Sequence, residues 1–489
     1  MLFSTTSILM RPVPSHSGLA HPINQSFSEA HPMFRIPSGL QQIIPPAAAK
    51  KVLELLHQPA LTQAVKDAAQ KIGWPDMQAP GQIQEIWQQA KQWMESTLQT
   101  GHSPVPLNAA VINGTGRIFH STLGGVPLPL GVADQAARML SYLTTKTIEE
   151  NLRETLCQQS GAEDALVVIS VEHAIGLLNH LPQASDGWLV PRGDYVSWNA
   201  DSHLGNCLDT SAKSSIPIGS ITHCSEQDFL HGLKGTRHGV LRLSPSNAGA
   251  SSTAGSHTAI DLRQVKTPHS VVHAEVLLNG TLIDLETTAL PMTRVASRLS
   301  SGSSMVIVPG DRFIGGPACG IILGSSSYIS ALREAARKLR LEVHPLLACM
   351  LQLVVTKQPD KISWQQQPVG AMLTNGVANL KDRAKRLEFQ IQSSEPITSC
   401  QIVERAEAIG DYVWENCTLP GIALEIELKS FDQWSEQIQR EKGVTVLGVR
   451  TGNKLTLHLR SIDPADDRLL ADLFPNATET AATTGSVEE

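Results

Sequence analysis

The chain has 489 residues, a formal net charge of −7 and a hydrophobic fraction of 41%. That length predicts roughly three structural units, with enough material for a large buried core. The negative charge excludes a general affinity for nucleic acid, although it is compatible with a local basic patch. No apolar run approaches the ~20 residues that a membrane span requires, so we expect no membrane partner.

Seven cysteines are scattered along the chain, and no two of them form a C-x-x-C pair. This spacing argues against zinc and against a disulfide framework, and it suits a reducing compartment. The sequence therefore predicts no metal site and a cytoplasmic location.

Both ends of the chain lack the patterning of folded elements. Residues 1–33 are rich in Ser, His and Pro, and we expect a disordered leader there and a disordered tail at 475–489. Residues 34–107 carry apolar residues at three- and four-residue spacing, which predicts a small helical N-terminal domain. This domain serves either as a packing arm or as a recognition element.

Residues 108–355 alternate short β-type runs with helical stretches, which predicts an α/β fold with a mainly parallel sheet and helices on both faces. A helical connection over 356–396 and a small α+β domain over 397–474 follow. Ligand sites in parallel sheets lie at the carboxyl ends of strands, where Ser170, Arg192, Ser244 and Arg312 are expected. The β-type runs are 165–170, 188–191, 215–219, 239–243, 270–278, 304–310 and 320–324.

The stretch VPGDRFIGGPACGIILG (308–324) consists of two apolar runs separated by charged residues and a Gly-Gly-Pro turn. This pattern predicts two buried strands joined by a tight loop. We expect that loop to present Arg312 to a pocket.

Four segments carry a resemblance to a known family: VINGTGRIFHSTLGGVPLP (111–129), LCQQSGAEDALVV (156–168), GDRFIGGPACGII (310–322) and RKLRLEVHPLLACML (337–351). In this order they resemble segments of bacterial selenocysteine synthase, the L-seryl-tRNA(Sec) selenium transferase family. The resemblance implies the fold type I architecture of pyridoxal phosphate (PLP) transferases. It also implies conversion of seryl-tRNA(Sec) with selenophosphate and PLP, and a homo-oligomer, because family active sites form between subunits.

The family's catalytic lysine lies in a G-D-K segment, and the residue that matches it here is Arg312. A PLP enzyme needs an amine that condenses with the cofactor aldehyde, whereas a guanidinium stays protonated and does not. We therefore expect no covalent attachment of PLP. Arg312 still offers a fork of donors to a phosphate or carboxylate.

Two further family positions differ in this chain. The aspartate under the pyridine nitrogen matches Val276, and Glu275, one residue away, points to the opposite face unless the strand is bulged. The asparagines whose helix-end amides receive the phosphate are replaced by Ile169, Ser170 and Val171, followed by Glu172. A carboxylate in that first turn competes with a phosphate for the helix end.

The resemblance implies roles for a few more residues. It places Ser170, Asp311, Gly315 and Gly316 at the cofactor site.

Three arginines and two other polar residues also match family segments. Arg337 and Arg340 match an R-x-x-R that lines the selenium-donor anion site, and their spacing predicts one helical face. The alternative is a solvated basic face. Arg192 matches an R-G pair, or caps a strand end. Asn113 and His120 are expected to satisfy backbone groups.

The sequence thus predicts a selenium-transferase-like protein with a degenerate PLP site. Its role would be non-catalytic: binding tRNA or another anion, or assembling with an active paralogue. The alternative is a working selenium transferase, or a related PLP-dependent transferase or lyase, that uses an atypical lysine. Lys213 and Lys266 lie in the large domain, but neither has the required loop around it.

Overall fold

The computed structural model describes residues 110–140, 147–200, 202–208, 215–234, 237–244, 271–285, 290 and 292–474. The predicted leader, the helical N-terminal domain and the tail lie outside these residues. The predicted domain boundaries stay predictions.

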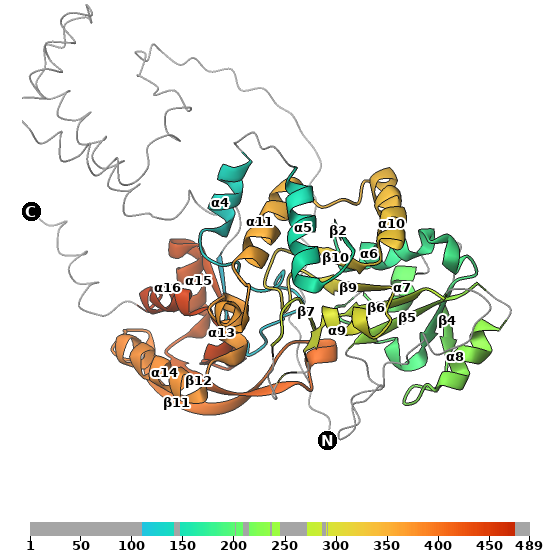
Figure 1. The fold of residues 1–489 in the computed structure, drawn as a ribbon. Coiled ribbons are helices and arrows are strands. Elements are labelled where there is room, and N and C mark those ends of the chain that lie inside the picture. The colour runs from blue at the N-terminus through green and yellow to red at the C-terminus, as the bar shows by residue number, and fades with distance from the viewer. Residues whose placement is uncertain are drawn as a thin grey trace, which may run out of the picture. The chain divides into compact units, whose positions relative to one another are not determined.

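A seven-stranded sheet forms the centre of the large domain (Figure 1). Its strands are β2 (Asp164–Val168), β3 (Trp188–Pro191), β4 (Ser215–Ile218), β5 (Gly239–Ser244), β6 (His273–Leu277), β9 (Met305–Pro309) and β10 (Gly320–Gly324). Their order is β2-β10-β9-β6-β5-β3-β4. Strand β10 is antiparallel to both of its neighbours, and the other adjacent pairs are parallel. All seven β-type runs form strands, and the prediction of a mainly parallel sheet is confirmed.

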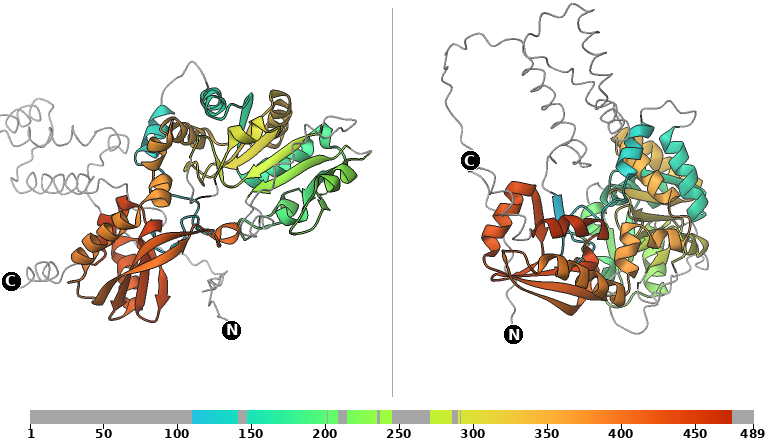
Figure 2. Two further views of the ribbon diagram at one scale, coloured as in Figure 1. Left: turned by 60° about the horizontal axis from the view of Figure 1, so that its bottom comes forward. Right: turned by 90° about the vertical axis from the view of Figure 1, so that its left-hand side faces the viewer.

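The central strands are buried on both faces, which explains their continuous apolar sequences. In β9, Met305 and Ile307 pack into one hydrophobic core, whereas Val306 and Val308 pack into the other. Helices lie against both faces of the sheet (Figure 2). The helices of the large domain are α4 (Val132–Met139), α5 (Ile148–Ser160), α6 (Val171–Leu177), α7 (Leu204–Leu208), α8 (Glu226–Leu233), α9 (Val295–Ser300), α10 (Ser326–Leu339) and α11 (Pro345–Thr356).

A second, smaller sheet follows the helical connection, with the order β11-β12-β15-β14. Its strands are antiparallel, and a hairpin at RTGNK (450–454) joins β14 to β15. The elements of this part are α12 (Lys361–Gln365), α13 (Pro368–Thr374), α14 (Val377–Ile391), β11 (Ile397–Ala408), β12 (Thr418–Leu428), α15 (Phe431–Lys442), β14 (Val449–Thr451), β15 (Lys454–His458) and α16 (Asp467–Asp472).

Two short pairs of strands complete the description. Strand β1 (Ala110–Asn113) pairs in parallel with β13 (Val444–Leu447), so the first described residues contact the C-terminal part. Strand β7 (Gly280–Thr281) pairs with β8 (Thr293–Arg294). None of the helices in the described ranges has both the length and the apolar composition to cross a membrane.

The loop between β9 and β10 is closed by its own backbone. The amide of Gly316 donates to the carbonyl of Gly310 at 2.8 Å, and the amide of Gly315 donates to the carbonyl of Arg312 at 3.0 Å. Where the loop enters β10, a Cβ on Gly320 would lie 2.4 Å from the carbonyl oxygen of Ser170. The glycine therefore lets the loop lie directly against the end of β2.

We expect Gly320→Ala to lower the free energy of unfolding by about 1–3 kcal/mol, because neither backbone segment has room for a methyl group. Urea denaturation of the purified chain measures this change. Gly376→Ala is the matched control, since no atom lies within 4 Å of the added Cβ; its cost at a helix N-cap should stay below about 1 kcal/mol. Equal losses in the two variants would show that the close approach at Gly320 is unimportant.

Candidate functional site

The loop after β9 holds Arg312 against an aromatic cluster. The guanidinium carbon of Arg312 lies 5.6 Å from the centre of the Phe119 ring, within the range of a cation–π interaction. Phe119 and Phe313 meet edge to face at 5.0 Å, and Trp414 lies 5.4 Å from Phe313. The Nη1 atom of Arg312 is buried and makes no hydrogen bond within the described residues. The loop thus presents a positive charge with an unused donor.

The end of β2 and the start of α6 carry a carboxylate. Ser170 is the N-cap of α6, and its Oγ accepts from the backbone amide of His173 at 3.3 Å. In the first turn, Glu172 accepts from the indole of Trp198 at 2.9 Å. Burial raises the pKa of Glu172, but hydrogen bonds from Ser170 and Trp198 outweigh burial and bring this pKa below its usual range. The helix end is therefore already supplied with a negative charge.

The strand position expected to meet a pyridine nitrogen carries no acid. Val276 packs into the same core as Ile307, on the face of the sheet that α6 covers. Glu275 points to the other face, where it binds Arg298 at 2.6 Å and the hydroxyl of Ser303. The pairing of β6 with β5 and β9 continues through this position without a register shift, so no bulge turns Glu275 round.

These three positions do not fit a covalently bound PLP. Arg312 supplies no amine that forms an imine, Glu172 opposes a phosphate, and Val276 leaves a pyridinium without a counter-charge. In the described part of the chain, no group of three or more His, Cys, Asp or Glu side chains is arranged to hold a metal ion.

The other predicted cofactor residues lie in the same loop. The Asp311 side chain lies against Gly125, where an added Cβ would be 2.9 Å from the Cβ of Asp311. Gly315 has φ 70°, a left-handed conformation that glycine adopts without strain. Ser170 contacts Gly320 at the end of this loop, so the structure brings Ser170, Asp311, Gly315 and the loop arginine to one edge of the sheet.

The predicted anion-site arginines are spread out. Arg192 is exposed and donates from Nη1 to the carbonyl of Gly219, which is the strand-end cap described above as the alternative. Three strand spacings separate β3 from β9, which is about 14 Å. Arg337 is exposed and forms an ion pair with Glu342 at 3.1 Å.

The prediction that Arg337 and Arg340 share one helical face is wrong. Helix α10 ends at Leu339, and Arg340 is its C-cap, with φ 57° in the left-handed region. This turn redirects the chain toward β2, where the amide of Ile169 donates to the carbonyl of Leu341 at 3.0 Å. An i, i+3 spacing gives a shared face only while the helix continues.

Asn113 and His120 satisfy local backbone groups, as expected. The Asn113 amide donates to the carbonyl of Arg117 at 2.8 Å, and Nδ1 of His120 accepts from the amide of Thr122 at 3.3 Å. The sequence did not predict that Trp198 binds Glu172 or that Arg298 binds Glu275. These contacts join residues that are 26 and 23 positions apart. No local pattern signals such contacts.

Comparison with known proteins agrees with this architecture. A family profile described as L-seryl-tRNA selenium transferase matches residues 111–463. The L-seryl-tRNA(Sec) selenium transferase of Alkaliphilus oremlandii is 25% identical over 377 residues, which span 74% of this chain and 81% of the relative. The protein of the same name from Desulfotalea psychrophila is 24% identical over 383 residues, with the same coverage.

A solved structure supports the fold. D-glucosaminate-6-phosphate ammonia-lyase aligns with a TM-score of 0.51 and 14% identity, over 79% of this chain and 99% of that one. At that identity the likeness concerns architecture alone, which is the fold type I arrangement of PLP enzymes. Since the family profile covers most of the chain, this protein belongs to the L-seryl-tRNA(Sec) selenium transferase family.

Proposed function

We propose that this chain is a catalytically degenerate selenium transferase that serves as a binding or assembly protein. The observation that carries the proposal is Arg312 in the loop between β9 and β10. A guanidinium remains protonated at neutral pH, so it neither attacks an aldehyde nor shuttles protons afterwards. Backbone hydrogen bonds close the loop, so the fold does not require a lysine at position 312.

The same residue gives the site a binding capacity. Arg312 places a buried, unused donor beside Phe119, where water competes poorly for it. Planar guanidinium groups bind carboxylates and phosphates through two parallel hydrogen bonds. We therefore assign anion binding to Arg312.

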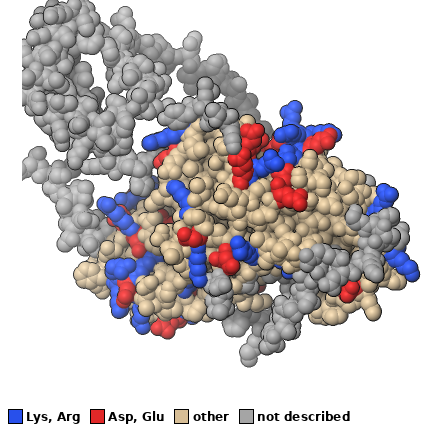
Figure 3. Space-filling model, in the orientation of Figure 1, with Lys and Arg blue, Asp and Glu red and all other residues tan. Residues whose placement is uncertain are grey.

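The names of the relatives support a proposal about binding partners. The relatives are named for an activity on seryl-tRNA(Sec), which makes tRNA, or an active paralogue that handles it, the proposed partner, with the chain itself as a homo-oligomer. On the face shown in Figure 3, basic side chains alternate with acidic ones and form no continuous stripe. A tRNA contact with the described residues of this face would therefore be local. The seven cysteines all lie in the described residues and form no disulfide there, which suits the proposed cytoplasmic location.

The lost chemistry can be tested directly. After addition of PLP, we expect no absorbance band of a lysine imine in the wild-type chain, and no borohydride-reduced lysine adduct in its peptide map. The triple variant Arg312→Lys, Val276→Asp, Glu172→Asn restores the amine, the acid and a neutral helix end, and it should gain an adduct at position 312. A reduced lysine adduct in the wild-type chain would refute the degenerate site.

Glu172 should contribute to acid sensitivity. Its folded pKa is lowered, so its stabilising effect is complete above its unfolded pKa, near 4.5, and is lost as the pH falls through the folded value. Urea unfolding between pH 6 and about 3 should show a smaller loss of stability in Glu172→Gln than in wild type. The control is Glu436→Gln, an exposed carboxylate on α15, which should keep the wild-type profile.

Binding of tRNA has its own signature. In a filter-binding titration we expect retention of tRNA that weakens as salt rises, because phosphate contacts release counterions. A small number of contacts predicts a shallow slope. Retention that is absent, or that does not depend on salt, would remove tRNA from the proposal and leave the active paralogue.

A further inference from the structure

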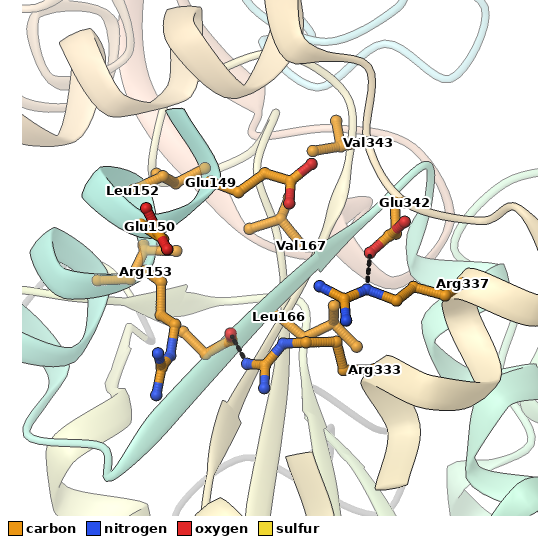
Figure 4. Close-up of a pocket in the computed structure, with 12 residues that line it drawn as sticks. Glu149, Glu150, Leu152, Arg153, Leu166, Val167, Arg333, Arg337, Glu342 and Val343 are labelled. Atoms are coloured by element: carbon orange, nitrogen blue, oxygen red, sulfur yellow. Dashed lines mark hydrogen bonds and ion pairs between the residues drawn. The ribbon is translucent and has the colours of Figure 1, made fainter. Parts of the chain in front are cut away.

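A cavity of about 310 Å³ lies at the outer edge of the central sheet, between α5, β2 and α10 (Figure 4). None of its lining residues belongs to the Arg312 loop. Its base is apolar, and its walls carry three arginines and three glutamates. The lining residues are Glu149, Glu150, Leu152, Arg153, Leu156, Ala165, Leu166, Val167, Arg333, Arg337, Glu342 and Val343.

The basic wall is fixed by one buried carboxylate. Oδ1 of Asp164 accepts from Nε of Arg153 at 2.5 Å and from Nη2 of Arg333 at 2.7 Å. Asp164 is 1% exposed, and it also accepts from the backbone amide of Ala165. Two guanidinium groups therefore share one negative charge, which leaves this wall with a net positive charge.

Both wall arginines of α10 have donors to spare. Arg333 uses only Nη2, which also donates to the carbonyl of Ala165 at 2.9 Å, so its Nε and Nη1 make no hydrogen bond within the described residues. Arg337 uses only Nε, on Glu342. In Figure 4 both guanidinium groups extend from α10 into the space between that helix and α5. Spare planar donors of this kind suit a carboxylate.

The acidic wall comes from the first turn of α5. Glu150 closes the capping box, since its side chain accepts from the amide of Thr147 at 2.9 Å. The neighbouring Glu149 has no hydrogen-bond or ion-pair partner among the described residues, and its side chain points from α5 toward the cavity (Figure 4). An exposed carboxylate without a partner suits an ammonium group.

We propose that this cavity binds a small zwitterion of the α-amino acid class, with its carboxylate on Arg333 and its ammonium on Glu149. The volume is at the lower end of the range for ligand pockets, which fits a single small molecule. The spare donors of Arg333 and the carboxylate of Glu149 come from different helices, α10 and α5, so a ligand with only one charge leaves one of these two groups unmatched. The apolar base, with Leu152, Leu166 and Val343, accommodates a short side chain.

Calorimetric titration of the full chain with three matched probes tests this site. L-alanine carries both charges, propionate lacks the ammonium, and ethylamine lacks the carboxylate. We expect L-alanine to bind at least tenfold more tightly than either of the others, since each lost charge-assisted contact is worth about a factor of ten or more.

Variants separate the two walls. Glu149→Gln should weaken L-alanine about tenfold and leave propionate unchanged, and Arg333→Lys should weaken both, while it keeps a positive charge beside Asp164. Glu334→Gln is the control, because Glu334 lies on α10 and pairs with Lys338 outside the cavity. The proposal is overturned if L-alanine binds no better than propionate, if Glu149→Gln leaves L-alanine affinity intact, or if none of the probes binds. These outcomes do not depend on the PLP experiment.

Discussion

The packing of the β9–β10 loop is the constraint on which the rest of the site depends. Every residue of these two strands is buried, and Gly320 fits only because it lacks a Cβ beside the carbonyl of Ser170. These contacts fix the backbone, whereas the side chain of Arg312 lies over the ring of Phe119. The geometry of the loop therefore does not depend on the chemistry of the side chain at position 312.

The three altered positions act in the same direction. A cofactor phosphate requires positive potential, but the matching helix end carries Glu172. A pyridinium requires a carboxylate, but the matching strand position carries Val276. An aldehyde requires a neutral amine, but the matching loop position carries Arg312. Each change alone would weaken binding of the cofactor. Together they oppose binding of the phosphate, the ring and the aldehyde, and the remaining carboxylate in β6, Glu275, binds Arg298 on the opposite face.

The sequence predicted the sheet well because its strands are apolar on both faces, a signal that needs no partner to be recognised. It placed Arg312 and Ser170 at one edge because parallel strands end together, and the family resemblance added Asp311. It failed at Arg340, since a left-handed C-cap in a non-glycine residue leaves no mark in the spacing. It also missed the bond from Trp198 to Glu172 and the free carboxylate of Glu149, because the first depends on long-range packing and the second on which neighbouring glutamate caps the helix.

The charged side chains Arg312 and Arg333 determine which ligands this fold is suited to bind. A buried guanidinium donor without a partner is costly, so the anion proposed to bind Arg312 would remove that cost. Arg333 differs, because Asp164 already offsets part of its charge and holds it in place for a second carboxylate. A preorganised donor loses little freedom on binding. Under the two proposals the chain combines two cationic positions of different character, Arg312 in the β9–β10 loop and Arg333 at the outer edge of the sheet, and each would bind an anion without a covalent cofactor.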